Sequence, residues 1–347
     1  MGQKGAVALT LVVSALGAFL FNLIGAPAAY LTGGAFAVTG LVLLGVRAEL
    51  PSLLRSGAFA LLGIIMGTGV SGEAIEDLPG LPIAIIGLAV AIAGATVASY
   101  YTLRRLGRWD PVTALCGSIP GAFAVVLAVS LEKGAVMERV VIAQALRLFV
   151  LVALVPFALG GASTGSLGIA AGDHTLLDVV LTVCVAFLSA FVAVKVRLPA
   201  APMLGPLIVS AVISSTGVMT IALPGWLSGL AFALLGASVA VRFGGLKRGE
   251  FLGLLTVSMA AFATAFAAAM TVAVAVTFLV NESFGSVLIA YSPGGVDAMV
   301  ALSFLLGFDV AFVALLHVVR VTGLSIVAPI IVGRLHRAVK KGDGGQT

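Results

Sequence analysis

Apolar segments long enough to cross a lipid bilayer recur along the whole chain, for example at 5–24, 81–101 and 251–280. A helix needs about 17 to 25 mainly apolar residues to cross the hydrocarbon core. Of the 347 residues, 61% are hydrophobic and only 10% are charged, whereas soluble domains are about 45–50% apolar and about 25% charged. The sequence therefore predicts an all-α integral membrane protein and not a soluble domain with one anchor.

The formal net charge of +5 does not indicate a nucleic-acid partner, because the basic residues form short clusters between the apolar segments. Such clusters are typical of the cytoplasmic loops of membrane proteins. The two cysteines, Cys116 and Cys184, both lie in apolar stretches that are far apart in the sequence. We interpret both as small residues of the protein core.

Matching residues recur along the chain at an offset of 172 to 173 positions. The clearest matches are Pro27-Ala28-Ala29 with Pro199-Ala200-Ala201, the string AFALLG at 58–63 with the same string at 231–236, Pro120-Gly121 with Pro293-Gly294, Arg147 with Arg320, and Pro156 with Pro329. Matched prolines and arginines are not expected by chance in a chain rich in alanine, glycine, leucine and valine. We predict membrane repeats at 1–160 and 174–335, a linker at 161–173 and a cytoplasmic tail at 336–347.

Each repeat contains six apolar segments, and the fifth is interrupted in both copies. The interruption runs from Ser118 to Gly121 in the first copy and from Tyr291 to Gly295 in the second. Proline removes a backbone donor, and glycine relaxes the backbone. Each fifth segment should therefore consist of two half helices around a non-helical break, with a simple helix kink as the alternative.

The distribution of basic residues distinguishes two topologies. If the broken segments enter and leave on the same side, the chain crosses ten times, and seventeen of the nineteen Lys and Arg residues fall on the cytoplasmic side. The other two, Arg147 and Arg320, lie within helices. If the broken segments cross, seven of the seventeen move outside, against the positive-inside rule. We predict two inverted repeats, each of about five transmembrane helices plus one broken or re-entrant helical hairpin, with both termini cytoplasmic.

Inverted repeats that contain broken helices are typical of secondary transporters, whose sites lie where the breaks meet. The amino-terminal ends of half helices attract anions. Arg147 and Arg320 lie near mid-depth, where an arginine is costly and marks a candidate site. We expect Asp297 to be the partner of Arg320. The alternative is that each arginine caps free carbonyl groups of the adjacent break and never meets a substrate.

The predicted site residues fall into two groups. For proton or ion coupling we predict Asp297 and His317, because histidine titrates near neutral pH, although a histidine in a helix can also be a packing residue. For substrate binding we predict Ser118, Pro120, Gly121, Arg147, Ser292, Pro293, Gly294, Asp297 and Arg320.

These residues also carry a family resemblance. The strings SIPGA at 118–122, QALR at 144–147 and SPGG at 292–295, followed by Asp309, His317 and Arg320, resemble the duplicated motif of the AbrB family of bacterial inner-membrane proteins. That family is unrelated to the soluble DNA-binding regulator of the same name. The resemblance covers essentially the whole chain and implies a multi-pass protein of the bacterial inner membrane. Family members carry the labels ammonia monooxygenase, regulator of gene expression or transporter.

A monooxygenase would need clustered metal ligands, but the three histidines, His174, His317 and His336, show no metal-ligand spacing. We therefore expect neither enzyme activity nor a metal or other cofactor. The predicted function is a secondary transporter or exporter of a small anionic or zwitterionic solute. The expected partners are that solute and the lipid bilayer, without nucleic acid, and with homo-oligomerisation left open. The alternative is a membrane-embedded regulatory or sensor protein that affects gene expression indirectly.

Overall fold

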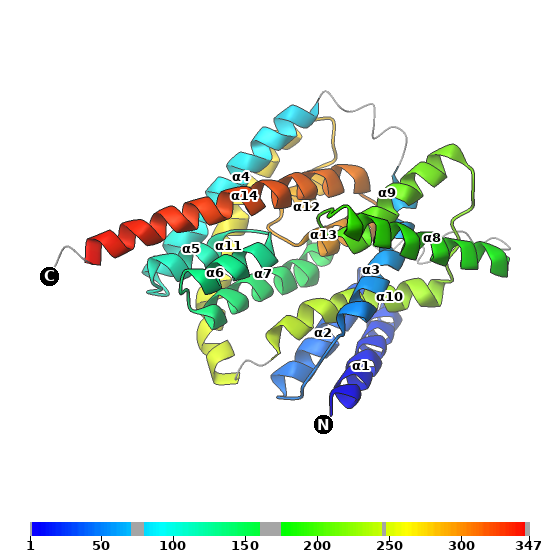
Figure 1. Ribbon diagram of the computed structural model, residues 1–347, viewed down its shortest axis with the longest axis horizontal. Helices are drawn as coiled ribbons and strands as arrows, with labels where there is room; N and C mark the ends of the chain where they lie inside the picture. Colours follow the sequence, from blue (N-terminus) through cyan, green and yellow to red (C-terminus); the bar gives the residue numbers. More distant parts are fainter. Residues whose placement is uncertain (1, 71–79, 160–174, 245–247, 344–347) are drawn as a thin grey trace. The chain divides into compact units, whose positions relative to one another are not determined.

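The computed structural model describes residues 2–70, 80–159, 175–244 and 248–343, and within these ranges all regular structure is helical (Figure 1). The predicted linker at 161–173 lies outside the described residues. The predicted tail, in contrast, begins inside the last helix, α14 (Val310–Asp343).

Within the described residues, eight helical segments are long and apolar enough to cross a membrane. The chain is therefore an all-α integral membrane protein. The eight segments are α1 (Gln3–Leu23), α3 (Ser52–Met66) with the 3-10 turn η1 (Gly67–Gly69), α4 (Leu81–Arg105), α7 (Met137–Ala158), α8 (Leu176–Lys195), α10 (Gly225–Ala240) with the 3-10 turn η4 (Val241–Phe243), α11 (Arg248–Thr277) and α14. The ten-crossing prediction also needs α2 (Ala29–Leu43) and α9 (Ala201–Thr216), which are shorter, with 15 and 16 residues.

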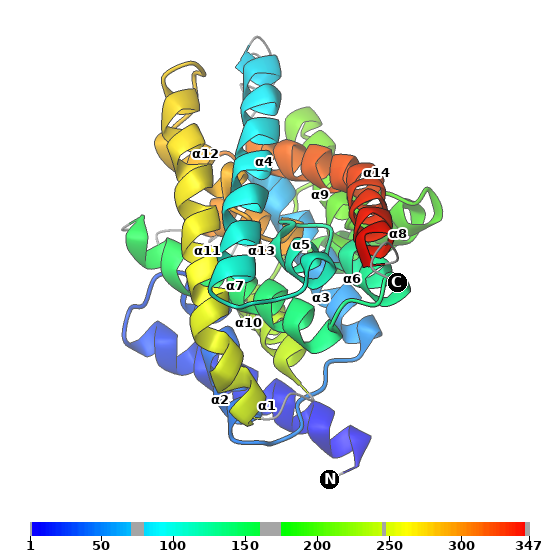
Figure 2. The same ribbon diagram turned by 90° about the vertical axis from the view of Figure 1, so that its left-hand side faces the viewer.

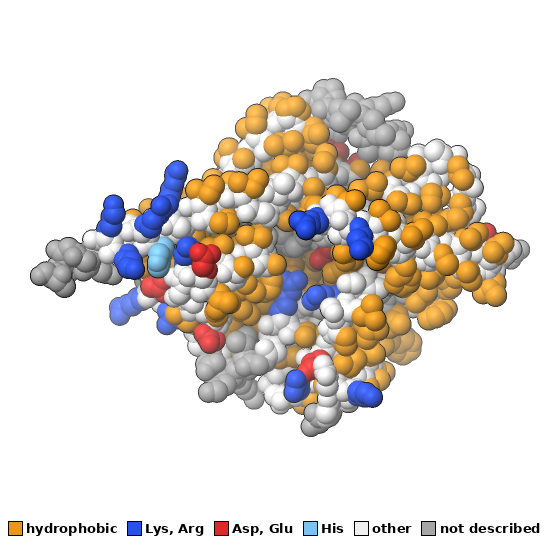
Figure 3. Space-filling view, in the orientation of Figure 1, with side chains coloured by type: hydrophobic (Ala, Val, Ile, Leu, Met, Phe, Trp, Pro, Cys, Tyr) orange, Lys and Arg blue, Asp and Glu red, His pale blue; other side chains and the backbone are white. Residues whose placement is uncertain are grey.

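The surface is apolar, as a lipid environment requires. Ile86, Leu188 and Ile326 are each more than half exposed on their helices, and hydrophobic side chains cover most of the face seen in Figure 3. A group of Lys, Arg and His side chains lies at the C-terminal end of α14 (Figure 3). Cys116 is buried, as expected, but Cys184 is exposed. The interpretation of Cys184 as a core residue was wrong, because its position on α8 faces outward.

The order of the elements occurs twice along the chain. The series α1 to α7 returns as α8 to α14, and six of the seven equivalent helices begin 172 or 173 residues apart. The matched Pro-Ala-Ala strings now have a structural reason. Ala28 and Ala200 are the residues that precede α2 and α9, and both adopt the left-handed conformation, with φ values of 49° and 48°.

Both fifth segments are divided into two short helices. In the first repeat α5 (Pro111–Ser118) ends before the break and α6 (Phe123–Glu132) begins after it. In the second repeat the equivalent helices are α12 (Phe284–Tyr291) and α13 (Val296–Leu305). The prediction of two half helices around a non-helical break is therefore confirmed. Each break contains a proline, which lacks the amide hydrogen that a continuing helix would need.

The chain forms two compact units, and neither coincides with a sequence repeat. The first unit comprises 1–79, 152–245 and 296–314, and the second comprises 80–151, 246–295 and 315–347. Thus α1 to α3, α8 to α10 and α13 belong to the first unit. The second unit contains α4, α5, α6, α11, α12 and most of α7 and α14. Both breaks and both buried arginines therefore belong to the second unit.

In the first unit, helices of one repeat pack on helices of the other, and α3 packs on α9 as α10 packs on α2. Glycine permits both crossings. A Cβ atom on Gly63 would lie 2.1 Å from the carbonyl oxygen of Met203, and one on Gly236 would lie 2.2 Å from that of Leu31. Small residues at such contacts let membrane helices approach closely, so the glycine in each copy of the AFALLG string serves packing.

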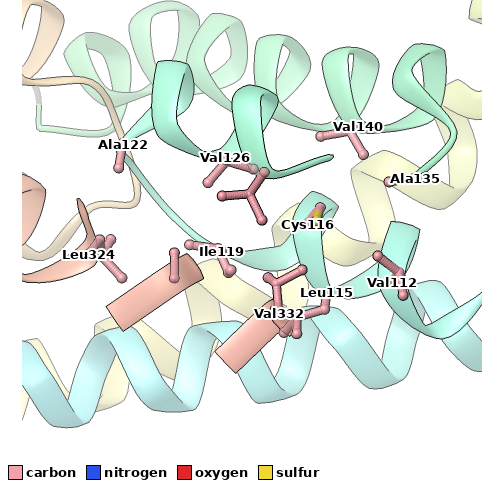
Figure 4. Close-up of a cluster of buried hydrophobic side chains, with 12 residues drawn as sticks. Val112, Leu115, Cys116, Ile119, Ala122, Val126, Ala135, Val140, Leu324 and Val332 are labelled. Atoms are coloured by element: carbon pink, nitrogen blue, oxygen red, sulfur yellow. The ribbon is translucent and has the colours of Figure 1, made fainter. Parts of the chain in front are cut away.

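In the second unit, α4 and α11 lie side by side in opposite directions (Figure 2). The hydroxyl groups of Thr102 and Thr264 are hydrogen-bonded at 3.0 Å near one end of the pair. Figure 4 shows the apolar cluster on the other side of α4, where Leu115 and Ile119 of α5 meet Leu324 and Val332 of α14. This cluster fixes α5, and hence the first break, against the helix that carries Arg320.

Candidate functional site

The candidate site consists of the two breaks and the two arginines, all in the second unit. Arg147 lies on α7 and Arg320 on α14, each ten residues after the first residue of its helix. Both side chains are buried, with exposed fractions of 5% and 2%. Each guanidinium group donates to a carbonyl oxygen 28 residues earlier, in the break of its own repeat. The arginines therefore occupy equivalent positions in the two copies.

Arg320 holds the second break through two short hydrogen bonds. Its Nη1 donates to the carbonyl oxygen of Ser292 at 2.6 Å, and its Nη2 donates to that of Gly294 at 2.7 Å. Because α12 ends at Tyr291, these carbonyl groups receive no amide hydrogen from a following helical turn. The Ser292 oxygen also accepts the amide hydrogen of Gly294, at 2.7 Å. A guanidinium group has several donors in a fixed plane and can satisfy both acceptors at once.

Arg147 holds the first break together with a residue that the sequence analysis did not select. Gln144 donates from Nε2 to the carbonyl oxygens of Cys116 and Ile119, both at 2.9 Å. Arg147 donates from Nη2 to the same Ile119 oxygen at 3.2 Å and also to Oε1 of Gln144. Its position in the sequence could have identified Gln144 as a candidate, because it lies one turn before Arg147, as His317 lies one turn before Arg320 in the second repeat.

The other predicted residues of the breaks lie beside these carbonyl groups. Ser118 and Ser292 are fully buried, and their hydroxyl groups donate to the carbonyl oxygens of Leu115 and Leu288, in their own short helices. Such local bonds are common for serine at helix ends. Pro120 and Pro293 are the residues at which the helices stop. The capping alternative therefore describes the observed bonds of both arginines and both serines.

Capping does not use every donor of Arg320. Its Nε is buried and has no hydrogen-bond partner among the described residues. A Cβ atom on Gly121 would lie 3.4 Å from this Nε. Gly121 itself has a φ of +90°, a conformation that favours glycine. The break of the first repeat thus meets the arginine of the second, with an unused donor at the meeting point.

The charges at this point repel one another. An electrostatic interaction couples Arg320 to Arg147, and its sign is unfavourable because both groups are cationic. Among the described residues of the second unit, no carboxylate forms an ion pair with either arginine. Buried charges are usually paired. Two buried guanidinium groups without a carboxylate are suited chemically to an anion.

The structure gives Asp297 other partners than the expected Arg320. Asp297 lies in the first unit, is half-buried, and interacts electrostatically with Arg242 and Arg55 of that unit. The reason is the packing of α13 on α3 and α10, since Arg55 lies on α3 and Arg242 on the turn that continues α10. His317 is fully buried on α14, one turn before Arg320.

A metal centre is not formed by the part of the chain that the structure describes, where no three His, Cys, Asp or Glu side chains lie close enough to hold an ion. The acceptors and donors of the candidate site are instead backbone carbonyl groups, one amide and two guanidinium groups. Such a set can bind and orient an anion, but it contains no nucleophile that these contacts activate.

The chain is similar to known proteins over most of its length. Residues 30–336 match the family AbrB, described as "Transition state regulatory protein AbrB". A protein of Escherichia coli (strain K12) named "Putative regulator AbrB" is 26% identical over 313 residues, which cover 88% of this chain and 89% of that protein. "Uncharacterized protein YhjN" of Bacillus subtilis (strain 168) is 26% identical over 264 residues, which cover 69% of this chain and 67% of that protein.

Proposed function

The chain belongs to the AbrB family, and we propose that it is a secondary transporter or exporter of a small anionic or zwitterionic solute. The observation that carries this proposal is the pair of buried arginines, one from each repeat, beside the two helix breaks. Arginines of this kind in membrane proteins usually lie on substrate or ion pathways. We further propose a bacterial inner-membrane location with both termini in the cytoplasm.

An anion is favoured over a cation by the charges of the site. An arginine at the centre of a bilayer costs about 2.5–3.5 kcal/mol on insertion scales, and mutual repulsion adds to the cost of this pair. An anion beside both groups would offset part of it. A cation would add to the repulsion and would find only carbonyl groups that already accept hydrogen bonds from Arg147, Gln144 and Arg320.

Alternating access would follow from movement of the second unit, which carries the breaks and arginines, relative to the first. The division of the chain into two compact units supports this mechanism. The antiparallel arrangement of α4 and α11 supports the inverted repeat, because equivalent helices of inverted repeats run in opposite directions. Asp297 and His317 are the candidates for proton or ion coupling, since both are titratable and at least half-buried.

Regulation of gene expression remains the second candidate, supported by the word regulator in the name of the Escherichia coli relative. In this proposal the effect on transcription is indirect and arises from the amount of solute on one side of the membrane. The two candidates differ in one measurable property. A transporter moves solute in a purified system that contains no other protein, whereas a sensor only binds it. We do not propose enzyme activity.

Reconstitution into liposomes tests the transport proposal. Liposomes that contain the purified protein should take up or release labelled small acids under a proton or sodium gradient. Arg147→Gln and Arg320→Gln should abolish this flux, whereas Arg337→Gln, at an exposed position on α14, should leave it unchanged. Size-exclusion chromatography would establish that each variant is folded. Absence of flux for every acid and amino acid screened, under either gradient, would refute the proposal.

A further inference from the structure

An apolar groove of about 470 Å³ opens beside Arg320 within the second unit. Its walls are residues 85–97 of α4 and 319–331 of α14, and the remaining side is formed by Leu115 of α5 and by Ile119, which follows α5. Among its lining residues, Arg320 is the only charged one and Thr96 is the only other polar side chain. A groove that is apolar along its length and cationic at one place fits a ligand that has an apolar part and one anionic group.

The charged part of the groove has a hydrogen-bond donor that a ligand could use. Arg320 is almost fully buried, and its Nε has no hydrogen-bond partner among the described residues. Gly121 lies beside this donor, because a Cβ atom there would meet Arg320 Nε at 3.4 Å and Leu324 at 3.7 Å. Leu324 is itself a lining residue, next to Ile119 and Ala122 in Figure 4. The groove therefore leads to the first break.

The apolar part of the groove opens onto an apolar helix surface, which we expect to face lipid. Val97, Val327 and Ile331 line it and have exposed fractions of 54%, 44% and 47%, on helices that are long and apolar enough to cross the membrane. The lining stretches of α4 and α14 each extend over about 18 Å, at roughly 1.5 Å per helical residue. This length suits an extended alkyl chain that lies along the two helices.

We infer that the anion handled at this site is a single-chain amphiphile, an alkyl carboxylate that enters from the bilayer. The carboxylate accepts a hydrogen bond from Arg320 Nε, and the alkyl chain lies between α4 and α14. One chain is favoured over the two chains of a phospholipid, because about 470 Å³ is in the lower half of the range for small-molecule sites. This inference rests on the proposed function, for which it names the class of substrate.

Photo-crosslinking in phosphatidylcholine vesicles tests the inference with the full chain. Dodecanoate with a diazirine group at the end of its chain should label peptides from 85–97 and 319–331. Unlabelled dodecanoate should compete for this labelling, whereas acetate should not. The matching diazirine alcohol, which lacks the carboxylate, should label these peptides about tenfold less, because the charge-assisted hydrogen bond is lost.

Two glycine variants provide a matched pair for the same assay. A Cβ atom at Gly323, in the groove, or at Gly253, on α11 outside it, would meet nothing within 4 Å. A side chain can therefore begin at either position without a clash at its Cβ atom. Gly323→Leu should reduce labelling roughly tenfold, because the added side chain fills the space of the alkyl chain. Gly253→Leu should leave labelling unchanged.

Labelling that is unaffected by Gly323→Leu, or equal for the carboxylate and the alcohol, would overturn the inference. So would a bound phospholipid that dodecanoate does not displace. These results are distinguishable from failure of the transport proposal. Flux of short acids without labelling of the groove would support transport and refute the amphiphile. Labelling of the groove without flux of any solute would support the amphiphile site and refute transport.

Discussion

Replacing Arg320 by glutamine should destabilise the protein more than the equivalent replacement of Arg147. Arg320 donates to the carbonyl oxygens of Ser292 and Gly294, at 2.6 and 2.7 Å, and the Ser292 oxygen also accepts the amide hydrogen of Gly294 at 2.7 Å. Hydrogen bonds to charged groups contribute about 1.5–3 kcal/mol each, so losing both would cost roughly 3–6 kcal/mol. A glutamine side chain is shorter and has only one amide group with which to replace them.

The first break has a second source of hydrogen bonds. When Arg147 is replaced, Gln144 still donates to the carbonyl oxygens of Cys116 and Ile119. Arg147→Gln loses two bonds, one to the Ile119 oxygen at 3.2 Å and one to Oε1 of Gln144, but both carbonyl groups of the break keep Gln144 as a donor. We therefore expect Arg147→Gln to cost about 1–3 kcal/mol, the range for leaving one buried acceptor unsatisfied. Either replacement removes the repulsion between the two guanidinium groups, so this repulsion does not distinguish the two variants.

Thermal unfolding in a mild detergent, followed by tryptophan fluorescence and aggregation, would measure the difference. Arg320→Gln should lower the midpoint clearly more than Arg147→Gln does. The double variant Gln144→Ala with Arg147→Gln should reach the level of Arg320→Gln, because the first break then loses both of its caps. Equal midpoints for the two single variants, or a lower one for Arg147→Gln, would refute the capping argument.

Two further predictions concern packing and topology. Gly63→Ala should destabilise the chain by roughly 1–3 kcal/mol, because its Cβ would lie too close to a backbone oxygen of α9. Gly253→Ala, in open space, should leave the stability unchanged, and equal unfolding midpoints for the two variants would contradict this packing. The topology can be tested by cysteine labelling in a Cys184→Ser background. If the repeats are inverted, a cysteine that replaces Lys133 should be labelled from the cytoplasm, and one that replaces Leu306, the equivalent position, should be labelled from outside. Labelling of both from one side would exclude the inversion.

The fold could be predicted from the sequence wherever local chemistry decides it. Pro120 and Pro293 are each followed by glycine, and together these residues disfavour a continuous helix, so both breaks were predictable and are present. Proline alone is not sufficient, because Pro156 and Pro329 lie inside α7 and α14. Apolar length likewise predicts spanning helices. The two compact units were not predictable, because they depend on which helices of one repeat contact helices of the other. No pattern along the chain indicates that α3 packs on α9.

In the candidate site, too, features that depend on local chemistry were predictable, and features that depend on helix packing were not. The sequence identified the two arginines because a charge is unusual within an apolar helix. It paired Asp297 with Arg320 because Asp297 lies one turn past the second break, but α13 packs on α3 and α10, and the electrostatic partners of Asp297 there are Arg55 and Arg242. Gln144 was not selected, since a glutamine is recognisable as a cap only when the carbonyl groups that it meets are known.

The crossed packing of the first unit has a consequence for how the chain is made. The ribosome delivers α2 and α3 long before their contact helices, α10 and α9, exist. Until then the surfaces of α3 at Gly63 and of α2, which later contact α9 and α10, lack these partners. The first half of the protein is therefore in the membrane before its packing is complete. Two separate copies of such a half could complete one another in the same way. The chain therefore resembles a dimer whose subunits have been joined into one polypeptide.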